Sequence, residues 1–322
     1  MKGLAASSSE TREAVGVLRR ARGAARAFPA DSDRTKGRRV SMTAMQDGSG
    51  VSKPDALSPA ETLAKAEALG VGKAGMDAGR CFVSAMLAGA FIAFGATYFA
   101  VFLGDPAMPF AAQRMVGGIC FCLGLELVLC CGAELFTGNN LMVVSLLSRK
   151  IGFGGLLRNW AIVWTGNLAG SLLVVALVFA ADVGAMNGGA VGDAMVSVAA
   201  GKVAPDWLTL FAKAVMCNVA VCLAVWIGYS ARTVADKVLG ILLPISFFVA
   251  AGFEHCVANM FFLPMGLIMK AAGHGAAVAG ADVIDAGSII CNLSAATLGN
   301  IAGGLLVGAA FWFVHRKKAG SR

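Results

Sequence analysis

The chain is short of charge. Only 14% of its 322 residues are Asp, Glu, Lys or Arg, whereas 57% are hydrophobic and the mean hydropathy is +0.73. Soluble domains carry about 25% charged residues. The composition therefore argues against a soluble class and indicates an integral protein that crosses a lipid bilayer several times.

Histidine is scarce as well, and the nine cysteines form no Cys-x-x-Cys motif. The cysteines lie in or at the ends of apolar runs, with no histidine at metal-ligand spacing, so we interpret them as small packing residues. We expect no metal and no cofactor. We expect no enzyme either, because the apolar segments contain neither His-Glu-x-x-His nor a catalytic pair of aspartates.

A nucleic-acid partner is not expected despite the net charge of +8. The basic residues gather in the first 40 positions and at the ends of the apolar segments, with no recognition motif and no interleaved aromatic patch. That distribution is typical of targeting and of membrane topology.

The first 50 residues lack the apolar core of 7–15 residues that a secretory signal needs. Residues 1–44 instead hold ten Lys or Arg and four Asp or Glu among Ser, Ala and Gly. This composition favours an organellar transit peptide, which would place the protein in the chloroplast envelope of an alga. The alternative is a disordered cytosolic tail on a plasma-membrane protein.

Residues 51–80 are predicted to contain a short amphipathic helix. Ser58 and Glu61 have the spacing of a capping box, and Pro59 stands at the first helical position. A transporter domain of six apolar segments follows in residues 81–315, and residues 316–322 form a basic tail. The predicted segments are 81–104, 115–148, 158–182, 206–231, 238–270 and 289–314.

The linkers between these segments predict the orientation. Basic residues follow the second, fourth and sixth segments, whereas the linkers after the third and fifth are mainly acidic. Because basic loops stay on the cytoplasmic side, both termini are predicted on the positive-inside face.

The chain also repeats itself. TGNLAGSLLV (165–174) matches LGNIAGGLLV (298–307), and GAELFTGNNL (132–141) corresponds to GFEHCVANMF (252–261). Each repeat holds three spans, and an odd number gives the two copies opposite topology. Inverted repeats with one broken helix each place a binding site near the bilayer midplane.

Four motifs, GAELFTGN, KAVMCNVAVCLAVW, GFEHCVANM and NLSAATLGNIAGG, resemble those of the formate/nitrite transporter family. The resemblance implies an all-α, aquaporin-like architecture with helices two and five broken, assembled as a homopentamer with a pore in each protomer. It implies transport of nitrite and/or formate with protons. Bicarbonate or lactate transport, or a neutral-solute channel, is the alternative.

His255 is the only histidine inside a predicted span, and an intramembrane ionisable residue is a functional candidate by default. The resemblance implies that it lies at the pore centre and exchanges a proton with the anion. Thr137 is expected beside it if the two breaks meet. Lys213 could extend to the membrane interface, while the resemblance implies that it attracts anions. The resemblance places Asn300 near the histidine, with Asn218 as a weaker candidate.

The remaining candidates concern the pore walls and the breaks. Read from the residues alone, four bulky side chains are core packing, but the resemblance implies that they form constrictions on either side of the histidine: Phe121, Leu125, Leu135 and Phe248. Five residues are expected to hold the broken segments: Glu134, Glu254, Gly138, Gly252 and Asn259. The two carboxylates are expected to accept hydrogen bonds from unwound backbone N–H groups. Glu126 departs from the family pattern and is expected to point toward a neighbouring helix or protomer.

Overall fold

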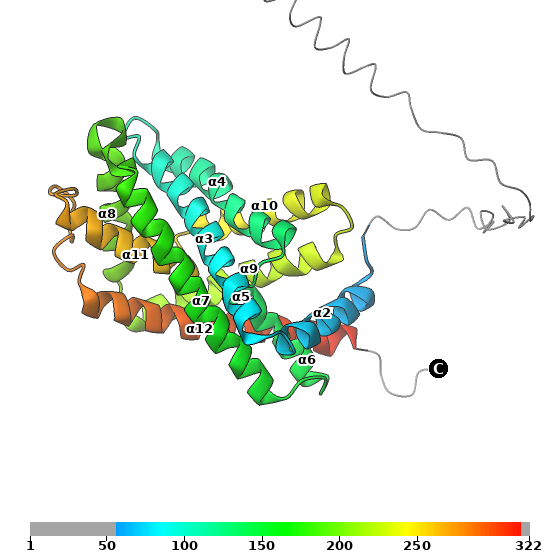
Figure 1. Cartoon of the computed structure of the whole chain (residues 1–322). Helices are drawn as coiled ribbons and strands as arrows, with labels where there is room; N and C mark the ends of the chain where they lie inside the picture. The colour runs from blue at the N-terminus through cyan, green and yellow to red at the C-terminus, as the bar shows by residue number, and fades with distance from the viewer. Residues whose placement is uncertain (1–55, 317–322) are drawn as a thin grey trace, which may run out of the picture. The chain divides into compact units, whose positions relative to one another are not determined.

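The computed structural model describes residues 56–316, and every regular element in that range is helical (Figure 1). In chain order the elements are α2 (Pro59–Ala74), α3 (Ala78–Leu103), α4 (Phe110–Cys131), α5 (Phe136–Asn139), the 3-10 helix η1 (Asn140–Met142), α6 (Val143–Leu147), α7 (Phe153–Ala180), the 3-10 helix η2 (Val183–Gly189), α8 (Ala190–Val203), α9 (Trp207–Ser230), α10 (Val234–Ala250), α11 (Cys256–Ala271) and α12 (Ala286–His315). The predicted transit peptide in residues 1–50 and most of the basic tail lie outside the described residues.

The six-span all-α fold is confirmed. Five helices are long and apolar enough to cross a bilayer: α3, α4, α7, α9 and α12. The remaining span, the fifth in chain order, is the pair α10 and α11, which are separated by residues 251–255. The second span is likewise broken, at 132–135, where α4 gives way to the short helices α5, η1 and α6.

The two halves of the chain have the same construction. In the first half α3 packs on α7, and in the second α9 packs on α12. Each half is opened by a shorter helix, α2 or α8, that packs against the second part of its own broken span. The two inverted repeats predicted from the sequence are therefore present, and the second of them has one helix more than expected.

The additional helix is α8. The stretch between the third and fourth predicted spans was interpreted as an acidic linker. In the structure its residues 190–203 form a helix whose Met195, Val196 and Ala199 are buried. Glycines at 184, 188, 189 and 192 obscure its start in the sequence. The helix matters for the site because Lys202 lies in its last turn.

Capping residues fix the helix starts. At α2 the predicted capping box is formed, with Glu61 N–H donating to Ser58 Oγ and Ser58 N–H to Glu61 Oε2. Asp206 caps α9 and Asp285 caps α12. Hydrogen bonds from Thr209 hold the pKa of Asp206 below its usual value, and those from Ser288 do the same for the pKa of Asp285.

Each break has a glycine in the left-handed region at or near its start, Gly132 with φ 79° and Gly252 with φ 71°. This conformation is open to glycine at little steric cost. Gly138, by contrast, lies inside α5 with helical neighbours, and a Cβ there would meet Val225 only at an ordinary 3.5 Å. The bend in the first repeat therefore depends on Gly132 and not on Gly138.

Candidate functional site

The two breaks are held by the same arrangement of asparagines. Asn167 Oδ1 accepts the N–H of Phe136 at 2.9 Å, while its Nδ2 donates to the carbonyls of Ala85 and Glu134 at 2.7 and 2.9 Å. The Phe136 N–H and the Glu134 carbonyl lie in or beside the break and would otherwise be unsatisfied in an apolar interior.

Asn300 repeats this pattern in the second half. Its Oδ1 accepts the N–H of Cys256 at 2.8 Å, and its Nδ2 donates to the carbonyls of Ala214 and Glu254 at 2.8 and 2.9 Å. Asn300 thus holds the backbone on both sides of His255. Its amide is engaged by three backbone groups and is a brace of the break.

Each break also contains a buried carboxylate. Glu134 accepts hydrogen bonds from Asn139 Nδ2 at 2.7 Å and from Lys73 Nζ at 2.6 Å, and Asn139 Nδ2 also donates to Asn159 Oδ1 at 2.9 Å. Lys73 lies in the last turn of α2, which ties that helix to the first break.

The corresponding carboxylate of the second break is Glu254. It accepts hydrogen bonds from Asn259 Nδ2 at 2.6 Å and from Lys202 Nζ at 3.3 Å, and Asn259 Nδ2 also donates to Asn292 Oδ1 at 2.7 Å. In both breaks the carboxylate oxygens therefore bind amide and ammonium side chains, where backbone N–H groups were expected.

The sequence interpretation missed Asn167 and five members of the carboxylate networks: Lys73, Asn139, Asn159, Lys202 and Asn292. A usable pattern was present, because Asn159 precedes Asn167 by the same eight residues that separate Asn292 from Asn300.

His255 is the N-cap residue of α11 and only 2% exposed. Its Nδ1 accepts the N–H of Ala258 at 3.0 Å, so in the neutral ring the proton is on Nε2. Nε2 lies 3.0 Å from Thr137 Oγ1, and we therefore assign the ring as donor to the hydroxyl. The two breaks meet at this contact.

Aromatic rings cover the histidine on one side. Phe248 stacks on the imidazole with centroids 5.7 Å apart and an angle of 16°, and Phe121 meets Phe248 edge-on at 5.8 Å. Leu125 and Leu135 are both buried. Leu135 is the N-cap residue of α5 and so has in the first break the place of His255 in the second.

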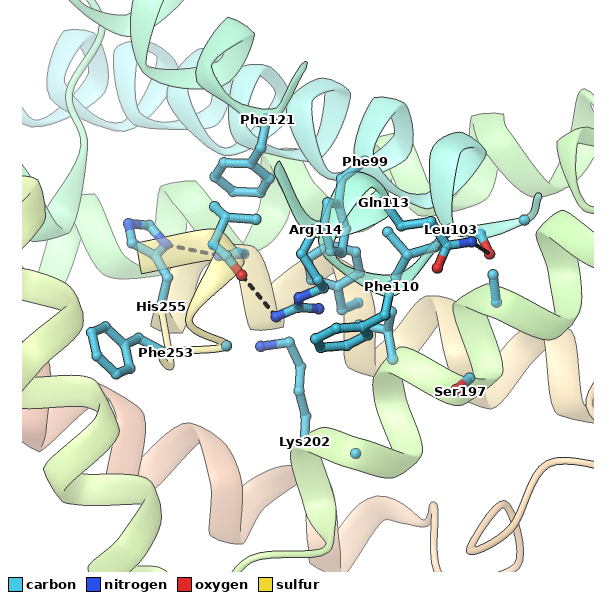
Figure 2. A pocket seen from close by; sticks show the side chains of 18 of the residues that line it. Phe99, Leu103, Phe110, Gln113, Arg114, Phe121, Ser197, Lys202, Phe253 and His255 are labelled. Atoms are coloured by element: carbon cyan, nitrogen blue, oxygen red, sulfur yellow. Dashed lines mark hydrogen bonds between the residues drawn. The ribbon is translucent and has the colours of Figure 1, made fainter. Parts of the chain in front are cut away.

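A cavity of about 750 Å³ extends to His255, and its wall includes residues of the loop after α3, of α8 and of the loop after α11 (Figure 2). Phe121 and Phe248 line its inner end. Its charged lining consists of three cations and two acids: Arg114, Lys202, Lys213, Asp193 and Glu254. Arg114 was missed because the second span was predicted to begin at residue 115, whereas α4 begins at 110.

The structure brings together His255, Thr137, Phe121 and Phe248, with Lys213 on the wall of the same cavity. Lys213 is one of two lysines there, and Lys202 is the one that contacts Glu254. Asn218 lies behind the site, where its Nδ2 donates to the carbonyls of Asn300 and Thr137 at 2.6 and 3.3 Å. Glu126 is partly buried on α4 and does not line the cavity.

Comparison with known proteins decides the family. The family model described as formate/nitrite transporter matches residues 60–314. The chain belongs to the formate/nitrite transporter family. It is 38% identical over 274 residues to the formate channel FocA of Escherichia coli (strain K12), covering 82% of this chain and 96% of FocA.

Two further comparisons agree with this membership. The probable formate transporter of Methanothermobacter thermautotrophicus is 36% identical over 280 residues, covering 81% of this chain and 98% of the relative. A solved structure, a pentameric formate channel with formate bound, superposes with a TM-score of 0.66 at 36% identity and covers 74% of this chain and 97% of that one. In this formate/nitrite transporter, then, the cavity and the two breaks occupy a fold whose known relatives are channels and transporters.

Proposed function

We propose that the protein carries small monovalent anions, formate and/or nitrite, across a membrane through a pore in each protomer of a homopentamer, with proton exchange at His255. The single observation that carries this proposal is the position of His255. The ring lies where the two broken helices meet, at the inner end of a cavity whose wall holds three cationic side chains.

The cavity offers what an anion needs on entering a medium of low polarity. Removing a small ion from water costs several kcal/mol, and a cleft lined by one sign of charge raises the local concentration of the opposite ion. Arg114 and Lys213 supply that field, while Lys202 compensates one of the two acidic side chains through its contact with Glu254. The aromatic wall of Phe121 and Phe248 then admits a dehydrated species to the ring.

Proton exchange lets the weak acid cross the narrowest part without charge. The hydrogen bonds support a neutral His255, with Nε2–H bonded to Thr137 and Nδ1 occupied by the Ala258 N–H. A second proton can be taken up only at Nδ1, so the imidazolium forms when the ring releases the cap of α11. The ring then donates that proton to an anion and returns to the capped, neutral state.

Bicarbonate or lactate transport by the same fold is the alternative substrate choice, and a water- or ammonia-like neutral-solute channel is the alternative mechanism. The cationic lining of the cavity favours an anion over a neutral solute. The experiment measures the uptake of formate, nitrite, bicarbonate and lactate into proteoliposomes between pH 5 and 8. Osmotic water flux is measured in the same proteoliposomes. Anion uptake that rises as the pH falls supports the proposal, and water flux without anion uptake contradicts it.

Topology and location are part of the proposal. The alternation of basic and acidic linkers supports placing both termini on the positive-inside face, with the cavity opening on the opposite face. The presequence-like residues 1–50 support an algal chloroplast envelope, with the plasma membrane as alternative. Amino-terminal sequencing of the mature protein tests this, because retention of residues 1–40 would contradict a cleaved transit peptide.

A further inference from the structure

Arg114 lies in the cavity wall at the point where α10 ends. Its Nε donates to the carbonyl of Ala250 at 3.1 Å and its Nη2 to the carbonyl of Val249 at 2.8 Å. The guanidinium carbon also lies 5.6 Å from the centroid of the Phe99 ring. These contacts hold the guanidinium beside Gly252, whose hypothetical Cβ would come within 3.1 Å of Nη2.

The guanidinium is not saturated by these bonds. Arginine has five N–H donors, and within residues 56–316 only the two carbonyls of α10 accept from it. Three N–H groups, including both on Nη1, therefore remain for a ligand. Arg114 lines the cavity that leads to His255, and Figure 2 shows its guanidinium above the Lys202 ammonium in that space.

The position makes physical sense for an anion path. The last carbonyls of a helix form the negative end of its dipole, so the end of α10 would repel an anion moving toward the ring. Arg114 covers two of these carbonyls and reverses the local sign. Glu254 lies on the same cavity and adds to the need for a positive group here.

Only one of the two repeats has a cationic residue at this position. Arg114 precedes the break glycine Gly132 by eighteen residues, and the residue that precedes Gly252 by the same distance is Val234. If Arg114 served only to hold the fold, an equivalent residue would be expected at both breaks, as Asn167 and Asn300 are. The one-sided cation instead belongs to the cavity.

We propose that Arg114 is a docking residue that binds a planar, two-oxygen monovalent anion bidentately before it reaches His255. The idea rests on the proposed anion transport and adds a basis for selectivity. Two parallel N–H groups match the two oxygens of a carboxylate or of nitrite, whereas an ammonium is a point charge. Lys202 is engaged by Glu254 and by the face of Phe262, 5.6 Å from its centroid, which leaves the fork of Arg114 as the directional group.

The test compares Arg114→Lys, which keeps the charge but loses the fork, with Lys213→Met, which removes a cation from the same cavity. In proteoliposomes, Arg114→Lys is expected to raise the half-saturating concentration of formate and nitrite about tenfold, the equivalent of one lost charge-assisted hydrogen bond. The inhibition of formate uptake by chloride should stay unchanged in this variant. Lys213→Met is expected to weaken the binding of formate and of chloride alike.

Two results would overturn the docking role alone. One is an Arg114→Lys variant that takes up formate as fast as wild type with the same half-saturating concentration. The other is an Arg114→Lys variant in which the binding of formate and the inhibition by chloride weaken equally. Wild-type protein that takes up no anion overturns the proposed function and the docking role together. A measurement on the unmutated protein covers the case in which Arg114→Lys does not fold. Modification of Arg114 by phenylglyoxal, followed by mass spectrometry, should be slowed by formate and not by chloride at equal ionic strength, and equal rates in the two salts would overturn the proposal.

Discussion

Thr137 Oγ1 and His255 Nε2 are 3.0 Å apart, although 118 residues separate them in the chain. Thr137 lies in α5, directly after the break of the first repeat, and His255 lies in the break of the second. The contact joins the two inverted halves at a single hydrogen bond, and the hydroxyl that accepts from the ring retains its own proton for a passing anion.

Removing that hydroxyl should therefore damage transport. Thr137→Val keeps the shape but leaves the buried Nε2–H without an acceptor, which costs about 1–3 kcal/mol. We expect formate uptake to fall at least about tenfold, a change equivalent to 1.4 kcal/mol, while Thr137→Ser retains most activity. Uptake in proteoliposomes measures this, and equal activity of the Val and Ser variants would contradict the role given to the hydroxyl.

Asn167 and Asn300 should be structural equivalents. Each amide makes three hydrogen bonds to backbone groups, two of them in or beside its break and one in a neighbouring helix. At about 1 kcal/mol for each bond, Asn167→Ala and Asn300→Ala are each expected to lower stability by about 3 kcal/mol. Thermal unfolding of the detergent-solubilised protein measures the loss. A large loss for one variant and none for the other would contradict the equivalence of the two breaks.

Lys202 should be needed chiefly as the partner of Glu254. The Glu254 side chain is 3% exposed, and removing one member of a buried pair costs about 3–5 kcal/mol because the other charge is left uncompensated. Lys202→Met is expected to be strongly destabilising, and the double variant Lys202→Met with Glu254→Gln should recover much of the loss. A double-mutant cycle on the thermal midpoint tests this, and additive losses would argue against a coupled pair.

Much of the fold could be predicted because the apolar segments and the two glycine-led breaks are local features of the sequence. Gly138 was expected to hold the first break, but the bend lies at Gly132. Both glycines belong to the motif GAELFTGN, and the backbone angle is what separates them. Helix α8 was missed because its glycine-rich start resembles a loop.

The site could be predicted only in part, because its contacts join distant positions. His255 and Thr137 stood out as polar residues within apolar runs. Arg114 and Lys202 looked like ordinary charges at the ends of spans, and their roles depend on where α10 ends and where α8 packs. Asn300 is adjacent to the histidine in space, but its three bonds to backbone groups could not be read from its position in the motif.

The central claim, proton exchange at His255, is tested most directly by the pH dependence of formate uptake in proteoliposomes containing wild type or His255→Asn. Asparagine is among the preferred N-cap residues, so this variant should keep the start of α11 while losing the titratable ring. A variant with alanine at 255 controls for loss of the cap. The account predicts that wild-type uptake rises as the pH falls and that His255→Asn loses both this dependence and most of the uptake. Unchanged uptake by His255→Asn across the whole pH range would contradict it.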